Sequence, residues 1–440
     1  MEAHVQATEP LVIDGLQYKL RPNGQYVTQR QSVSFHPSGS NYYQPEGGTR
    51  VLRIVLSDSA GGWLSGESVK LQFDIVNDSD DDLKRLFCIA PWAFFKRIRI
   101  SAGGSLVEEF DYARTHEMFA MFKPADIRLN DSIEAFNWVK GTIDELPTSV
   151  PHIDRGKRKT VCFSLLSGLL QSNKMLPLSY MKGGLTIELE LCNNYTDPII
   201  SVHTTAPWTA AAVSERWHLE NVQIKASLLR LDNGFQNSYD AHMLDGGLLA
   251  INYTGYVTAQ QSISGNDVTV NLSRQASHLK SAFVSFNRSE MNSYTIKEWS
   301  NFYHPMSQDS GEHNPDRELE WQIQIGGVVY PQTPVNSIAE TYAQLRQTVA
   351  NFGKEPLSIL PTEYHSSRFV IGYDFEMLPD VGYTGVNTKS GQMLTVKLKP
   401  KDRSLINNGT AADLMPDQLF MVLCTDNILE LRDSGVSVLD

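Results

Sequence analysis

The sequence contains few groupings of residues with the types and spacing that catalysis or metal binding needs. His116 and Glu117 begin like the helix of a zinc protease, in which a second histidine follows four residues after the first. Ala120 occupies that position, so the second metal ligand is missing. We therefore expect no metal at this place and a histidine that lies on the surface of a helix.

Glycine-containing segments also fail to match catalytic motifs. A P-loop needs a glycine five residues before its Gly-Lys pair, and neither Gly156 nor Gly353 has one. The segment 103–107 lacks the last glycine of a nucleophile elbow. The sequence thus predicts no catalytic, cofactor-binding or metal-binding residue and no cofactor, and we do not expect an enzyme.

An acidic turn from Asp78 to Asp82 offers carboxylates that could hold a calcium ion. It does not fit an EF-hand, because Leu83 stands where glycine is needed and Ile89 where the bidentate glutamate belongs. A solvated turn is the favoured interpretation, and a cation site stays the alternative.

The one basic cluster runs from Arg155 to Lys159. A solvated loop is favoured over a nuclear-import or phosphate-binding patch, because short basic runs are most often simply exposed. Trp92, Phe94 and Phe95 are expected in the core or at an interface, not in a sugar-binding platform.

Length and composition indicate a two-domain globular protein. At 440 residues the chain is too long for one hydrophobic core and suits two of about 200 residues each. Hydrophobic residues make up 41% and charged residues 20%, which excludes a disordered or fibrous chain. The net charge of −12 argues against non-specific binding of nucleic acid by the whole surface.

The four cysteines form no C-x-x-C motif and are expected to be buried free thiols in a reducing compartment. The start of the sequence lacks the basic and apolar regions of a signal peptide, and no apolar run reaches the roughly 20 residues that span a bilayer. We therefore expect a protein that is made and kept in the cytosol or nucleus, with no membrane-spanning segment.

Apolar and polar residues alternate along many short segments, most clearly in 185–191, which follows a Gly-Gly pair. This period of two is typical of a strand with one face in a core and the other in water. Three segments recur in the same order in the second half, which predicts one fold built twice. The pairs are 98–104 with 323–327, 185–191 with 394–399, and 227–232 with 427–432.

A few short helices are expected in loops, with candidates at 112–122 and 338–352, the second with Ser337 as its N-cap and Gly353 as its end. Many short strands and few helices favour an all-β fold of two tandem eight-stranded jelly-roll sandwiches. We predict a non-basic N-terminal arm with one short strand (32–35) at 1–49, a first jelly roll at 50–232 and a second at 233–440.

Three segments make the predicted order of strands specific enough to compare with a known family. They are 39–56, 69–77 and the passage from Leu176-Pro177 to Leu189. Together they resemble the double jelly-roll major capsid proteins of double-stranded DNA viruses. The resemblance lies in the adenovirus–tectivirus lineage, is nearest to virophages and Polinton-like viruses, and extends over essentially the whole chain.

The resemblance implies a structural subunit of the virion that is assembled in the host cytoplasm or nucleus. Three chains would form a pseudo-hexameric homotrimer, and trimers would tile an icosahedral capsid beside neighbouring capsomers, penton proteins and minor or cement proteins. The non-basic arm departs from capsid proteins that bind the genome through a cationic tail, so direct genome binding is not expected.

Two features are candidates for contacts between chains. The long connections 124–159 and 287–318 carry aromatic residues suited to a trimer interface. Equivalent strands carry Glu188 and Glu190 in one half and Lys397 and Lys399 in the other. Around a trimer this difference would favour an alternating order of first and second halves and disfavour contacts between like halves. The aromatic residues are Phe136, Trp138, Trp299, Phe302 and Tyr303.

Two alternatives remain open at this point. A two-domain jelly-roll protein that binds carbohydrate or glycoprotein would be expected to have a signal peptide and disulfides. A jelly-roll hydrolase or amidase would need a pair of carboxylates in a cleft, and the sequence does not point to one.

Overall fold

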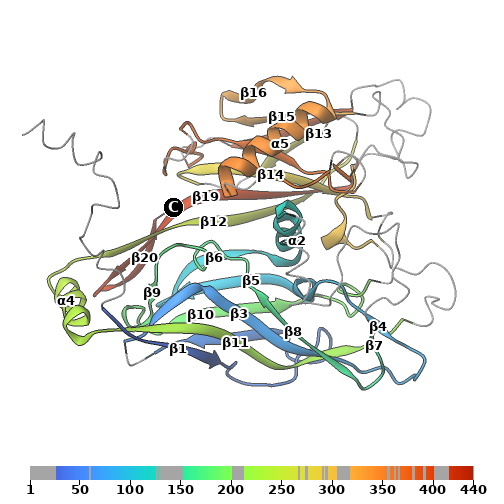
Figure 1. Ribbon diagram of the computed structural model, residues 1–440. Helices are drawn as coiled ribbons and strands as arrows, with labels where there is room; N and C mark the ends of the chain where they lie inside the picture. The colour runs from blue at the N-terminus through green and yellow to red at the C-terminus, as the bar shows by residue number, and fades with distance from the viewer. Residues whose placement is uncertain are drawn as a thin grey trace, which may run out of the picture.

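The computed structural model describes most of the chain, and its strands form two β-sandwiches (Figure 1). The described residues are 26–58, 61–124, 127, 152–200, 213–265, 268–272, 276–289, 292, 296–304, 318–353, 357–360, 363–364, 367–378, 382–389, 393–400 and 416–439.

A five-stranded and a four-stranded antiparallel sheet face each other in the first sandwich, the lower one in Figure 1, and the fifth strand is a short one that pairs with β3 (Trp63–Asn77) off the main order. Phe73 and Phe95 meet between these sheets with ring centroids 5.4 Å apart. One sheet has the order β1 (Val27–Phe35), β11 (Trp217–Leu231), β3 (Trp63–Asn77) and β8 (Arg158–Ser164). The other has the order β2 (Val51–Leu56), β10 (Leu185–Leu191), β5 (Phe95–Ala102) and β6 (Ser105–Asp111).

The second sandwich repeats this arrangement. Trp321 and Tyr373 lie between its sheets with ring centroids 6.3 Å apart. Its first sheet has the order β12 (Leu249–Ser262), β19 (Gln418–Arg432), β14 (Leu279–Asn287) and β17 (Ile371–Asp374). Its second sheet has the order β13 (Val268–Leu272), β18 (Leu394–Pro400), β15 (Leu319–Ile325) and β16 (Val328–Val335).

Strand connectivity is the same in the two sandwiches. If the eight sheet strands of each half are numbered along the chain, both halves have sheets of order 1-8-3-6 and 2-7-4-5. Each recurring pair of segments falls on equivalent strands, namely β5 with β15, β10 with β18, and β11 with β19. The predicted double jelly roll is therefore confirmed by topology as well as by strand content.

The strand β10 lies between two other strands of its sheet. Its apolar and polar residues alternate, so one of its faces can be buried. Its four leucine and isoleucine side chains are at most 1% exposed, and its polar residues point to the other face. Gly183 and Gly184 precede it with φ of 96° and 79°, a left-handed conformation that side chains disfavour. The turn thus sets the register in which β10 pairs with β2 and β5.

Short elements complete the two halves. Among the described residues, no helix is long and apolar enough to cross a bilayer. The additional strands are β4 (Leu86–Phe87), β7 (His152–Ile153), β9 (Leu176–Pro177) and β20 (Gly435–Leu439). The helices are α2 (Tyr112–Phe122), α4 (Asn233–Leu244) and α5 (Ile338–Gly353), with 3-10 turns η3 (Pro91–Phe94), η4 (Leu178–Tyr180) and η7 (Glu298–Ser300).

The prediction of an extended arm over 1–49 is wrong for β1. This strand pairs with β11 along its length and forms the edge of the first sheet. The short strand predicted at 32–35 is the C-terminal end of β1, whereas residues 27–31 show no alternation because all of them are exposed. The division at 233 stays a prediction, and it falls where Asp232 caps α4 through the Gly234 N–H at 3.0 Å.

Candidate functional site

The acidic turn from Asp78 to Asp82 is held by protein partners. Asp80 pairs with Arg216 at 2.7 Å, Asp82 pairs with Arg155 at 2.7 Å, and Asp78 contacts the ring of His218. In the part of the chain that is described, no cluster of histidine, cysteine and carboxylate side chains could hold a metal ion. The contacts favour the solvated turn over the cation site.

Two arginines of the basic cluster at 155–159 are engaged in ion pairs. Arg155 contacts the acidic turn, and Arg158 pairs with Glu220 at 3.2 Å. Both arginine side chains are largely exposed, so each pair adds at most about 1 kcal/mol to stability. This arrangement favours a solvated loop over a phosphate-binding patch.

The prediction that His116 lies on a helix surface is wrong. Its ring stacks on Trp92 with centroids 4.3 Å apart, and Nε2 lies 3.4 Å from the Ser164 carbonyl oxygen. Burial and, to a smaller degree, Lys123 lower the pKa of His116 to about 3. The imidazole is neutral at physiological pH and serves in aromatic packing.

Phe94 and Phe95 are fully buried, as the core interpretation predicts. The Trp92 indole N–H donates to Glu117 at 3.0 Å, and its ring is only partly buried. All four cysteines are free thiols, and three of them are buried, as expected.

A concentration of buried polar contacts lies at the junction between the two sandwiches. Arg114 of α2 extends into the second sandwich and is 8% exposed. Its guanidinium donates to Ser285 Oγ at 3.1 and 3.2 Å, to the Phe286 carbonyl at 2.8 Å and to the Glu298 carbonyl. Burial lowers the pKa of Arg114 to about 9 against the opposing effect of Glu298, so the group stays charged at neutral pH.

Aromatic rings surround this arginine and continue along α2. The Arg114 Cζ lies 4.5 Å from the ring centroid of Phe302 and 4.2 Å from that of Phe420, distances typical of cation–π contacts. Farther along α2, Phe119 and Phe122 lie 5.6 and 5.4 Å from Phe283 of β14. The helix therefore joins the two cores.

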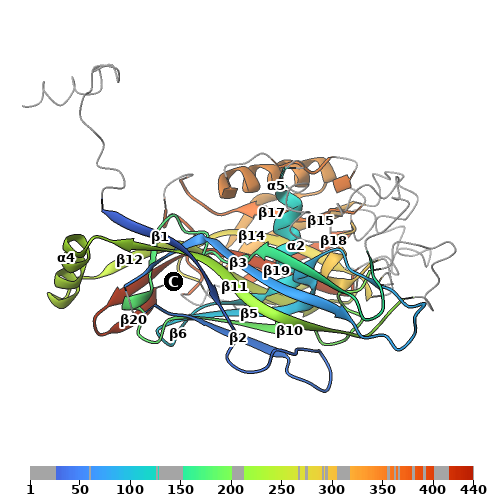
Figure 2. The ribbon, with the colours of Figure 1, turned by 60° about the horizontal axis from the view of Figure 1, so that its bottom comes forward.

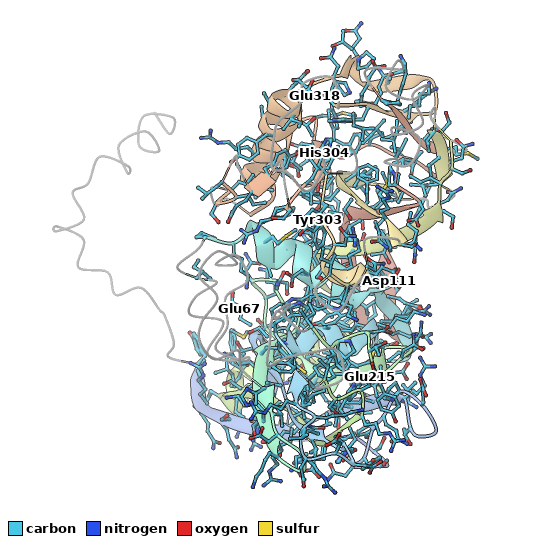
Figure 3. All side chains as sticks on the ribbon, turned by 90° about the vertical axis from the view of Figure 1, so that its right-hand side faces the viewer. Glu67, Asp111, Glu215, Tyr303, His304 and Glu318 are labelled. Carbon is cyan, nitrogen blue, oxygen red and sulfur yellow. The ribbon has the colours of Figure 1, made fainter. Side chains whose placement is uncertain are left out.

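The edge strand β6 makes polar contacts with the second sandwich. The Asp111 N–H donates to Thr258 Oγ1 at 2.9 Å, and the Tyr253 hydroxyl donates to the Val107 carbonyl at 3.1 Å. Figure 3 shows Asp111 at the level where the two halves meet. Together with α2, β6 covers the outer face of the sheet β12-β19-β14-β17.

Glu108 of β6 is a buried carboxylate in this junction, at 3% exposure. It accepts hydrogen bonds from Ser167 Oγ and from the Gly168 N–H at 2.9 Å. Burial raises its pKa from 4.5 to about 7, although the hydrogen bonds oppose this shift. A Cβ at Gly168 would lie 1.6 Å from the Thr254 carbonyl oxygen, so Glu108 fixes a turn that touches β12.

The prediction that Trp299 and Phe302 face other chains is wrong. Trp299 is 6% exposed and donates to the Asp197 carbonyl at 2.8 Å, and Phe302 is fully buried beside Arg114. They occupy the interface within the chain. Tyr303 is half-buried in the second sandwich (Figure 3), whereas Phe136 and Trp138 lie outside the described residues.

The structure does not bring the predicted acidic and basic strand faces together within one chain. Glu188 pairs with Arg53 at 3.4 Å and Glu190 with Arg50 at 3.7 Å, both across their own sheet. Lys399 pairs with Glu320 at 3.4 Å. A role in alternating contacts between chains stays a prediction, with Lys397 as its most exposed member.

Reversing Lys397 and Lys399 to glutamate provides the test of that role. If the lysines face acidic strands of another copy, the variant should assemble less well and lose the salt sensitivity of assembly. Assembly is measured by light scattering at several salt concentrations. Unchanged assembly and salt sensitivity would eliminate the hypothesis, and Lys389→Glu is a matched exposed control outside these strands.

Comparison with solved structures identifies proteins of the same fold. The structure superposes on the chain of the PBCV-1 virus capsid with a TM-score of 0.64 and 12% identity, over 97% of this chain and 99% of that chain. The Sputnik virophage gives 0.62 and 10%, over 97% and 91%, and the Faustovirus major capsid protein gives 0.55 and 10%, over 97% and 94%. The sequence matches no protein-family model and no curated protein.

These similarities extend over both sandwiches. At 10–12% identity they are evidence of a common fold, and the strand order of each half agrees with it. The chain therefore has the double jelly-roll fold that is found in viral major capsid proteins.

Proposed function

We propose that this protein is a viral major capsid protein, a structural subunit without enzymatic activity. The observation that carries the proposal is the repeated sandwich, which aligns over 97% of the chain with the PBCV-1 capsid chain. The buried junction supports it, because contacts such as those of Arg114 hold the two sandwiches as one block. A block of fixed shape is what a repeating shell requires.

In the proposed assembly three chains form a homotrimer with six sandwiches and a nearly hexagonal outline. Such trimers would tile an icosahedral capsid, with neighbouring capsomers and with penton and cement proteins as partners. The proposed location is the virion, after assembly in the host cytoplasm or nucleus. Within each chain, we propose that the first jelly roll begins at β1, not at residue 50.

The mass in solution tests this proposal. The chain should elute as a trimer of about 150 kDa, three times the 49.3 kDa of one chain, in size-exclusion chromatography with light scattering. Electron microscopy of concentrated material should reveal hexagonal tiles or icosahedral particles. A stable monomer with affinity for glycans would contradict the proposal and support the carbohydrate-binding alternative.

A further inference from the structure

A lysine of the second sandwich lies between two carboxylates. Lys280 is on β14, which lies between β19 and β17 in its sheet (Figure 2). Its Nζ lies 3.1 Å from Oε1 of Glu376, just beyond β17, and 3.9 Å from Oδ1 of Asp426 on β19. The three side chains are at most 19% exposed, so the group is largely shielded from water.

The strand that carries the lysine is irregular at this residue. The pairing of β14 with β19 shifts between Leu279 and Ser281, and Lys280 between them has no opposite residue on β19. Lys280 is therefore the extra residue of a β-bulge. Bulges redirect a side chain from its regular position and are frequent beside active sites.

A second irregularity lies at Tyr383, which contacts the same group. Its φ of 65° is in the left-handed region that side chains disfavour. In this conformation its N–H donates to Asp426 Oδ2 at 3.0 Å. A backbone N–H at this place would stabilise the negative charge that develops on a carboxyl oxygen under attack. Backbone strain of this kind is concentrated at functional sites.

Main-chain hydrogen bonds fix the three charged residues relative to one another. The Phe375 N–H, next to Glu376 in the sequence, donates to the Lys280 carbonyl at 2.8 Å. The Asp426 N–H donates to the His278 carbonyl at 3.0 Å, close to Lys280 on β14. Groups that are held together in this way react far faster than the same groups free in solution.

The charge states suit a reaction between the lysine and a carboxylate. Burial lowers the pKa of Lys280, but Asp426 and Glu376 outweigh it and raise the pKa overall, so the lysine is an ammonium. Burial raises the pKa of Glu376, although its hydrogen bond with Lys280 opposes this shift. Glu376 is therefore suited to accept a proton from the neighbouring ammonium and to release it again.

We propose that Lys280 and Asp426 form an amide bond within the chain, with Glu376 as the group that transfers protons. Glu376 accepts a proton from the ammonium, and the lone pair of Nζ then forms a bond to Cγ of Asp426. Glu376 passes this proton and a second one from Nζ to Oδ1, the Cγ–Oδ1 bond breaks, and water leaves. One ammonium and one carboxylate thus give one amide and one water molecule, and the step needs no further reactant.

Asp426 is the carboxylate that reacts because of its contacts. Its Oδ1 lies toward the lysine, and its Oδ2, which becomes the amide oxygen, accepts from the Tyr383 N–H. Glu376 has the shorter distance to Nζ, which suits the first proton transfer.

The bond would join β14 to β19 covalently. Its two residues are far apart in the sequence, so the bond closes a long loop and restricts the unfolded chain as a disulfide does. All four cysteines are free, so disulfides do not serve this purpose in the chain. The proposed bond lies within one chain and does not depend on the proposed trimer.

Intact-mass spectrometry of the denatured full-length protein tests the bond. The wild type should lack the mass of one water molecule, and its digest should contain a branched peptide that joins Lys280 to Asp426. Lys280→Arg keeps the positive charge but should have the full mass of its sequence. Glu376→Gln should form the bond roughly 100-fold more slowly after synthesis. Far-UV circular dichroism checks that both variants are folded.

The chain contains a matched ion pair that should not react. Lys399 and Glu320 lie 3.4 Å apart on neighbouring strands but are 40% and 28% exposed, and their peptides should stay unbranched. A wild type of full mass, or a loss of water that persists in Lys280→Arg, would show that the group is an ion pair alone. A branch at Glu376 in place of Asp426 would overturn the assignment of the two carboxylates. None of these results bears on trimer formation, so the proposed function is tested separately.

Discussion

Replacing Arg114 with alanine should lower the free energy of unfolding by about 3 kcal/mol. The change removes a buried guanidinium and leaves the Phe286 and Glu298 carbonyls and Ser285 Oγ without their donor. It also leaves space between the rings of Phe302 and Phe420. Urea unfolding followed by tryptophan fluorescence measures the loss.

The matched control for this variant is Arg53→Ala. Arg53 pairs with the Glu188 carboxylate, but its side chain is 60% exposed, so its removal should cost at most about 1 kcal/mol. Equal losses for the two variants would contradict the view that Arg114 fixes the junction. A second consequence distinguishes the two sites, because weakening the junction should expose it to limited proteolysis at lower urea concentration than in the control.

Replacing Glu108 with glutamine should make the protein more stable than the wild type above pH 7. Burial raises the pKa of Glu108 from 4.5 to about 7, so the folded state binds this proton more tightly than the unfolded state. The contribution of Glu108 to stability is therefore full below about pH 4.5 and is lost as the pH rises to about 7. The loss amounts to about 3 kcal/mol.

Glutamine keeps the hydrogen bonds that position this turn, because its amide can accept from the Gly168 N–H and donate to Ser167 Oγ. The difference in unfolding free energy between variant and wild type should grow from pH 4.5 to pH 7 and then stay constant. Glu67→Gln, at an exposed position, serves as the control and should give no such trend. A pH-independent difference for Glu108→Gln would contradict the buried, proton-binding state of this carboxyl group.

Much of the fold was predictable because the alternation of apolar and polar residues along a strand shows that one face of the strand is buried. The segments 185–191 and 319–325 each bury every second residue, and both strands begin and end where the alternation predicts. The N-cap of α5 is also confirmed, since Ser337 Oγ accepts from the Glu340 N–H at 3.1 Å. Local patterns of this kind depend only on neighbouring residues, which the sequence displays directly.

The junction was not predictable in the same way. Arg114 sits on a helix and Glu108 on a strand at positions that look solvent-facing in one sandwich alone. Both are buried because the second sandwich covers them, and no local pattern reports an arrangement between distant parts of the chain. Trp299 and Phe302 were predicted at an interface between chains and lie instead at the interface within the chain, because the sequence could not tell one kind of interface from the other.

The pairing of β1 with β11 has a consequence for how the chain is made. Thr28 and Arg230 are hydrogen-bonded at 3.2 Å although 202 residues separate them. At typical rates of translation, β1 must wait roughly 10 to 40 s before β11, its neighbour in the sheet, leaves the ribosome. A strand without a partner is a template for pairing with other polypeptides. Efficient production of the protein in a crowded host therefore depends on keeping nascent chains apart during that interval.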